Sequence, residues 1–179
     1  MQTLDDLQQE MRAAFLDGAP GMLVSALVWV TAGIVCTRSG MNAAVWTLFI
    51  GGALIHPFTT VVLKALGKGA RTSKRSPLTH LGMATTVWLI VGCVLSYGLY
   101  KANPAWFFPA MLLVIGSRYL AFQTLFGHRT YWSCGALLIA AGYICASLQL
   151  GPVTAAFAGA GIEAAFASFL LLRIDRAAA

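Results

Sequence analysis

Six long stretches with almost no charged side chains constrain this chain more than any other feature of its sequence. A helix needs about 20 residues to cross the hydrocarbon core of a bilayer, and the stretches lie at about 21–38, 43–66, 79–100, 105–126, 131–149 and 153–173. Charged residues make up only 10% of the chain, against about 25% in an ordinary soluble domain. The sequence therefore predicts an all-α fold, a polytopic membrane helix bundle of about six transmembrane helices. Residues 1–179 form a single integral membrane domain in this interpretation.

Residues 1–19 have a different pattern from the apolar stretches. Apolar residues recur there at spacings of three and four, with acidic residues on the other face, at Leu4, Leu7, Met11 and Phe15. This pattern predicts a short amphipathic helix, which we expect to lie on the cytoplasmic surface of the membrane. Thr3 followed by Asp6 fits a capping box at its start. Gly18-Ala19-Pro20-Gly21 then separates it from the first span.

Proline marks the start of three of the spans, and short matches between spans suggest a repeat. Each proline follows a residue that can cap a helix, in the pairs Ser76-Pro77, Asn103-Pro104 and Gly151-Pro152. The first span reads Ala32-Gly33-Ile34-Val35-Cys36 where the fifth reads Ala141-Gly142-Tyr143-Ile144-Cys145. Such matches are typical of three helical hairpins in parallel repetition, an arrangement found in transport folds.

The basic residues indicate orientation rather than nucleic-acid binding, although the formal charge is +6. They cluster beside the apolar stretches, where Lys and Arg mark the cytoplasmic side. Nine fall on one side of the membrane, and only Arg38 and Lys101 fall on the other. Both termini are therefore expected in the cytoplasm. The loop after the second span is expected to hold anionic lipid headgroups through Lys68, Arg71, Lys74 and Arg75.

Three ionisable residues, His56, Arg118 and Glu163, lie within the spans. A charge at the bilayer centre costs about 2.5–3.5 kcal/mol even on a lenient scale, so such residues normally face the bundle interior and pair. All three lie at a similar depth, and Arg118 and Glu163 are expected to form an ion pair. Ser117 and Tyr119 are candidates to add hydrogen-bonding groups. The sequence thus predicts a mid-membrane polar layer that binds a ligand.

The same residues also allow a purely structural interpretation. A buried ion pair can serve only to fix helix register, and His56 can be a neutral imidazole bonded to a neighbouring helix. His80 and His128 lie at cytoplasmic helix ends, where contact with water or lipid headgroups is expected. No spacing of Cys and His is typical of a zinc site, so we expect neither a metal nor a cofactor.

Several short motifs stand out along the chain, which reads Leu4-x-x-Leu7-x-x-Glu10-Met11, then Gly18-x-Pro20 and Ser25-x-x-x-Trp29, and later Ser76-Pro77-Leu78-x-x-Leu81-Gly82. These motifs resemble those of an uncharacterised family of small multi-spanning bacterial membrane proteins. The resemblance implies an inner-membrane location and an unknown function. It transfers no catalytic or binding residue.

Three functions remain open at this point. The first is a small-solute or proton-coupled transporter or permeation protein that uses the polar layer, alone or as a homo-oligomer. The second is a non-catalytic protein that binds a lipid or a partner, with a structural ion pair. The third is a lipid-modifying membrane enzyme with Glu163 or His56 as acid or base. The expected partners are the bilayer with its anionic lipids and a small polar solute, not nucleic acid.

Overall fold

The computed structural model describes residues 3–65, 67 and 77–178, and these residues are almost entirely helical. Helix α1 spans Leu4–Phe15, and the 3-10 turn η1 at Leu16–Gly18 joins it to α2. The long helices are α2 (Ala19–Ser39), α3 (Met41–Ala65), α4 (Pro77–Ala102), α5 (Phe107–Phe126), α6 (Thr130–Ser147) and α7 (Pro152–Ala178), with a second 3-10 turn, η2, at Pro104–Trp106. The described residues contain no strand.

Six helical segments are long and apolar enough to cross a membrane, the first of which combines α1, η1 and α2. The predicted polytopic helix bundle is therefore confirmed, and the bounds of the six long helices lie within a few residues of the predicted bounds at most ends. The predicted capping box also forms, because the Asp6 N–H donates to Thr3 Oγ1 and the Thr3 N–H donates to Asp6 Oδ2. The starts were predictable because prolines and capping residues satisfy or remove the free N–H groups of a first turn.

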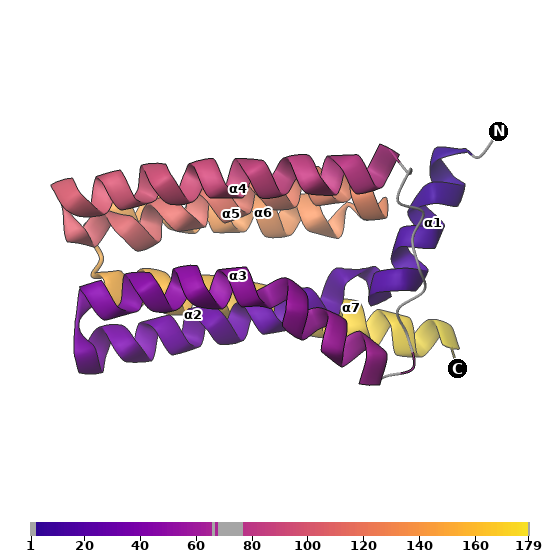
Figure 1. Cartoon of the computed structure of the whole chain (residues 1–179), viewed down its shortest axis with the longest axis horizontal. Helices are drawn as coiled ribbons and strands as arrows, with labels where there is room; N and C mark the ends of the chain where they lie inside the picture. Colours follow the sequence, from indigo (N-terminus) through magenta and orange to yellow (C-terminus); the bar gives the residue numbers. More distant parts are fainter. Residues whose placement is uncertain (1–2, 66, 68–76, 179) are drawn as a thin grey trace.

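The long helices form two groups that lie side by side, α2 with α3 and α7, and α4 with α5 and α6 (Figure 1). Helix α7 packs mainly on α2, and α6 packs mainly on α5, so the six helices do not form three equivalent hairpins. Both chain ends lie at the end of the bundle where α1 crosses it (Figure 1). We call this the α1 end, and the opposite end, with the α2–α3 turn at Gly40, the far end.

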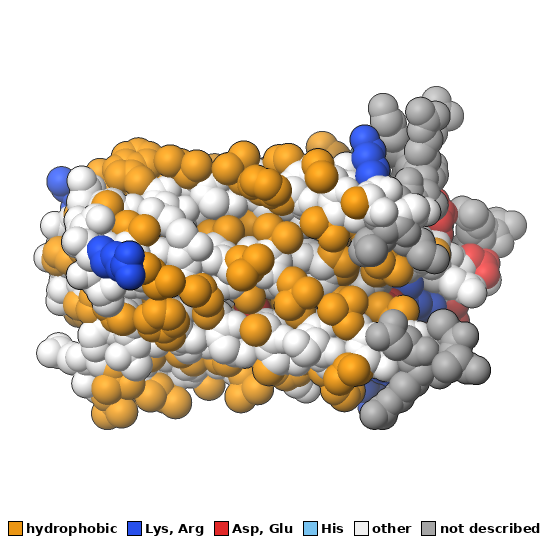
Figure 2. Space-filling view, turned by 90° about the horizontal axis from the view of Figure 1, so that it is seen from below, with side chains coloured by type: hydrophobic (Ala, Val, Ile, Leu, Met, Phe, Trp, Pro, Cys, Tyr) orange, Lys and Arg blue, Asp and Glu red, His pale blue; other side chains and the backbone are white. Residues whose placement is uncertain are grey.

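The sides of the bundle are apolar, and the charged side chains seen in Figure 2 gather toward its two ends. Large apolar side chains stay exposed on α3 and α4 in particular, for example Ile50, Val61, Val87 and Leu95. A soluble protein would bury such surfaces, whereas lipid accommodates them. This distribution is that of a multi-pass membrane protein.

Small residues bring α7 into close contact with α2. Ala156, Gly159, Ala160 and Ala167 are all buried, so this face of α7 packs on protein. Such residues let two helix backbones approach in a membrane, where association relies on packing rather than on the hydrophobic effect. The fully buried ring of Trp29 lies in this contact. The candidate site lies beside it.

Helix α3 bends in its second half (Figure 1), and Pro57 lies inside the helix there. Proline has no N–H to continue the helical hydrogen bonds and its ring pushes against the preceding turn. The Thr59 and Thr60 hydroxyls donate to the carbonyls of Ile55 and His56 in the same region. Beyond the bend, Thr59 and Leu63 are still buried, and Thr59 lies beside Gly21 of α2.

Candidate functional site

A fully buried carboxyl group at the middle of α7 is the centre of the candidate site. Glu163 has no exposed surface and lies about 16 Å along the helix from Pro152, at about 1.5 Å per residue. The Tyr119 hydroxyl of α5 donates a hydrogen bond of 3.0 Å to Glu163 Oε1. This bond joins the two helix groups at mid-span.

Two further side chains reach this carboxyl group from α2. The polar groups of the Ser25 and Trp29 side chains both lie close to the Glu163 carboxyl group. Nevertheless Glu163 Oε2 and Trp29 Nε1 are buried without a hydrogen-bond partner of normal geometry. A buried polar atom without a partner costs about 1–3 kcal/mol, and such atoms in a native protein call for an explanation. The unsatisfied acceptor and donor face one site.

Arg118 does not form the ion pair with Glu163 that its depth suggested. No Arg118 nitrogen lies within ion-pair distance of that carboxylate, and Arg118 Nε has no hydrogen-bond partner. Its guanidinium carbon instead lies 5.1 Å from the centre of the Phe122 ring, as in a cation–π contact. Successive residues of a helix point about 100° apart, so the Tyr119 position faces α7 and the Arg118 position does not. Arg118 remains an electrostatic neighbour of the site.

His56 and Ser117 lie outside the buried cluster. His56 is exposed on the surface of α3, whereas Glu163 is fully buried. Ser117 accepts a hydrogen bond of 3.0 Å from Trp88 Nε1 and donates to the carbonyl of Val114. The predicted layer therefore reduces to Glu163 with Tyr119 from α5 and Ser25 and Trp29 from α2, a set that we call the buried cluster. The headgroup residues predicted at Lys68, Arg71, Lys74 and Arg75 lie outside the described residues.

The charge of Glu163 needs compensation in this environment. An ionised carboxylate taken out of water without a cation costs several kcal/mol, and no described cation is within ion-pair distance. Either a proton or a bound cation can provide the compensation, and Oε2 is the atom free to receive it. The buried cluster is therefore suited to binding and releasing a positive charge.

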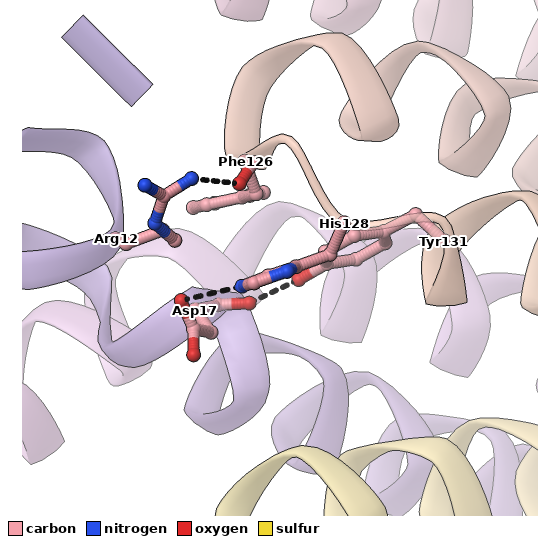
Figure 3. Close-up of polar contacts among 5 residues, drawn as sticks. All are labelled: Arg12, Asp17, Phe126, His128 and Tyr131. Atoms are coloured by element: carbon pink, nitrogen blue, oxygen red, sulfur yellow. Dashed lines mark hydrogen bonds and ion pairs between the residues drawn. The ribbon is translucent and has the colours of Figure 1, made fainter. Parts of the chain in front are cut away.

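A second group of polar contacts joins the α1 end to the turn between α5 and α6 (Figure 3). His128 Nε2 lies 3.2 Å from Asp17 Oδ1, and the Tyr131 hydroxyl donates to the backbone carbonyl of Asp17. Gln8 Nε2 donates to the carbonyl of Thr124, and Arg12 donates to the carbonyl of Phe126, each at 2.8 Å. These carbonyls belong to the last turn of α5 and have no partner within the helix. We call this group the α1 clasp.

The α1 clasp and the buried cluster share a stack of aromatic rings. The Tyr131 ring stacks on that of Tyr119 at 6.0 Å and on that of Phe126 at 5.3 Å. Tyr119 in turn holds Glu163. A continuous path of contacting side chains therefore runs from Asp17 through Tyr131 and Tyr119 to the mid-span carboxyl group.

The sequence analysis missed this clasp and misjudged one of its members. His128 is not solvated as expected, because only 20% of its side chain is exposed and it pairs with Asp17. Residues Leu16, Asp17 and Gly18 are all left-handed, with φ of 49°, 53° and 77°, a conformation that costs most residues energy. Of these three residues, only Gly18 is of a type that indicates a left-handed turn in the sequence. The amphipathic pattern of residues 3 to 17 gave no indication of which surface α1 would contact.

Comparisons with known proteins provide family membership only. The sequence model of one family, described as a family of unknown function, matches residues 4–173. Neither the curated proteins nor the solved structures contain a match. A function must therefore be argued from the buried cluster itself.

Proposed function

Because this chain belongs to DUF7010, a family of unknown function, we propose its function from the geometry of the buried cluster. We propose that the protein is a proton-coupled transporter or permeation protein for a small solute, and that Glu163 carries the proton. The observation behind this proposal is that an acceptor, Glu163 Oε2, and a donor, Trp29 Nε1, are both buried at mid-span without a hydrogen-bond partner. Ionisable residues within spans commonly belong to substrate paths and proton relays.

Tyr119 gives Glu163 a partner in either protonation state. Its hydroxyl donates to Oε1, so the ionised carboxylate keeps one hydrogen bond while Oε2 gains or loses a proton. A carboxyl group held in this way retains its position between the helix groups when its charge changes. Movement of those groups relative to each other would then depend on the charge at Glu163, which is the coupling that a transporter needs.

Proton flux into liposomes tests the proposal. Purified protein is reconstituted with an entrapped pH-sensitive dye, and an inside-negative potential is imposed with valinomycin and a potassium gradient. We expect the natural protein to acidify the lumen, and Glu163→Gln, which keeps the size and the hydrogen bond of the side chain, to give the rate of empty liposomes. His56→Gln, at the exposed position on α3, should keep the natural rate. Flux that persists in folded Glu163→Gln protein would falsify the role of this carboxyl group.

A second candidate function is favoured by the closed core around Glu163. The residue is fully buried, as expected of a lipid- or partner-binding protein in which the Tyr119 bond only fixes two helices. Thermal unfolding of Glu163→Gln, Tyr119→Phe and the double variant distinguishes a structural role of this hydrogen bond from a role of Glu163 in transport. A coupling of about 0.5–3 kcal/mol, together with no flux in the natural protein, would support the structural role.

We further propose the inner membrane of a bacterium as the location, with the α1 end in the cytoplasm. Among the described residues, Arg12, Arg129 and Arg173 lie near the α1 end. Arg38 and Lys101 lie at the far end. The positive-inside rule supports this orientation when the basic loop between α3 and α4 is included.

A further inference from the structure

An open groove of about 540 Å³ lies between α6 and α7 near the α1 end. Its lining changes from polar to apolar and consists of Arg129, Thr130 and Ser133 around the start of α6 and Ala165, Phe166 and Phe169 on α7. We propose that this groove binds one anionic phospholipid, with the phosphate at Arg129 and an acyl chain along the two phenylalanines. This inference does not depend on transport or on Glu163, which does not line the groove.

The polar end of the groove offers groups that recognise a phosphate. Arg129 is exposed immediately before α6, and its side chain makes no cap hydrogen bond. Within the described parts of the chain, the side chains of Arg129, Thr130 and Ser133 have no hydrogen-bond or ion-pair partner. A guanidinium with neighbouring hydroxyls suits phosphate oxygens, because charge-assisted bonds to them are short and directional.

The apolar end of the groove continues along one face of α7. Ala165 and Phe169 are four residues apart and therefore lie above one another on the helix. The Phe169 side chain is 54% exposed, although it is a large apolar group beside a polar opening. Arg173 follows one further turn toward the helix end and is also exposed. This face thus presents a cation near the span end and aromatic rings toward its middle.

The order of these groups matches an amphiphile lying parallel to the span. The headgroup of a phospholipid lies at the end of a transmembrane helix and its chain extends toward the middle. Trp132, on the first turn of α6, is 55% exposed, as is common for tryptophan at a membrane interface. The described lining of the groove holds Arg129 and no acidic residue, and Arg173 follows Phe169 on the same face of α7, so a net negative headgroup is favoured over a zwitterionic one.

The test measures lipid binding by native mass spectrometry and thermal shift on the detergent-purified full chain. The probes are phosphatidylglycerol, phosphatidylcholine with the same acyl chains, and inorganic phosphate. The variants are Arg129→Gln, the double variant Arg129→Gln with Arg173→Gln, and Phe169→Ala. Arg38→Gln at the far end is the matched control, because it also removes one exposed arginine.

We expect one phosphatidylglycerol to stay bound to the natural protein and to Arg38→Gln, and to stabilise both against heating. The double variant should bind it about tenfold more weakly or worse, since a phosphate contact of this kind is worth at least about 1.4 kcal/mol. Phe169→Ala should weaken binding without removing the preference for the negative headgroup. Equal binding by the natural protein and the double variant would overturn the proposal. Equal retention of phosphatidylglycerol and phosphatidylcholine would also overturn it. Stabilisation by inorganic phosphate alone would overturn it too, because it would show a site for a free anion rather than for a lipid.

Discussion

At position 159 the absence of a side chain decides how closely α2 approaches α7. A Cβ atom there would lie 3.0 Å from the Trp29 ring and 2.9 Å from Leu112 Cδ2. Both neighbours are fully buried and have little room to move. Gly159 is thus the residue that makes space for the indole beside the buried cluster.

We therefore expect Gly159→Ala to lower the free energy of unfolding by about 1–3 kcal/mol, the usual cost of overpacking a core. Gly161→Ala is the control in the same helix, because a Cβ there meets nothing within 4 Å. Its effect should stay below about 1 kcal/mol and can be favourable, since alanine suits a helix better than glycine. Thermal unfolding in detergent measures both, and equal shifts for the two variants would contradict this account.

The depth of a residue along its helix could be predicted from the sequence, but the direction in which its side chain points could not. The depth of Glu163 follows from counting along an apolar stretch, so the sequence correctly placed a carboxyl group at mid-span. The rotation of each helix about its own axis does not follow from such a count. Arg118 and Tyr119 are neighbours in sequence, and only the packing of α5 on α7 decides that Tyr119 bonds to Glu163. In lipid every face of these helices is apolar, so periodicity gave little guidance.

At the scale of the elements, the stability of the first turn of α1 depends on pH through Asp6. Hydrogen bonds from the backbone N–H of Thr3 and from its side chain hold the pKa of Asp6 below its ordinary value of 3.8. Because the folded pKa is the lower one, Asp6 stabilises the helix above the unfolded pKa. This contribution is lost as the pH falls through the folded pKa.

We expect Thr3→Val to raise the pKa of Asp6 only partway toward 3.8, because the larger contribution comes from the backbone N–H of residue 3, which remains. Titration of the Asp6 carboxyl by NMR in micelles measures the change. Fraying of α1 below this pKa should appear in the same spectra as averaged backbone shifts. An unchanged pKa in the variant would mean that the Thr3 hydroxyl plays no part.

The α1 clasp makes a second prediction at this scale. Gln8→Ala combined with Arg12→Ala removes both donors to the last turn of α5. A hydrogen bond to a charged donor is worth about 1.5–3 kcal/mol net, so amide exchange in residues 4–15 should accelerate by roughly tenfold or more. Hydrogen exchange followed by mass spectrometry measures this, with Arg38→Ala as the control. Unchanged exchange in α1 would show that other contacts hold it.

Helix boundaries were more predictable than helix contacts. Prolines, glycines and capping residues act through the backbone of their own turn, so Pro77, Pro104 and Pro152 marked starts without reference to the rest of the chain. The packing of α7 on α2 joins the two ends of the sequence. Nothing local indicates that α2 is the partner, although a row of small residues is typical of a helix face that packs on another helix.

For the whole molecule, both termini lie at the α1 end (Figure 1), and the distribution of Lys and Arg predicts that this end is cytoplasmic. A green fluorescent protein fused after residue 179 should therefore fluoresce in a bacterial host. Alkaline phosphatase inserted at Gly40, in the turn at the far end, should be active because it reaches the periplasm. The opposite result for both reporters would reverse the orientation.

The contact between α2 and α7 has a consequence for how the protein is made. Helix α2 leaves the ribosome first among the long helices, and α7 leaves last. Until then, the α2 surface around Ser25 and Trp29 lacks its contact with α7, although the Trp29 ring can already pack on Phe108 of α5. Glu163 likewise enters the membrane only when its binding partners on α2 and α5 are already there. A chain that stops before α7 would leave this part of α2 open and recognisable to a membrane protease, so α7 completes the packing around Trp29 and also covers the surface by which an incomplete bundle would be recognised.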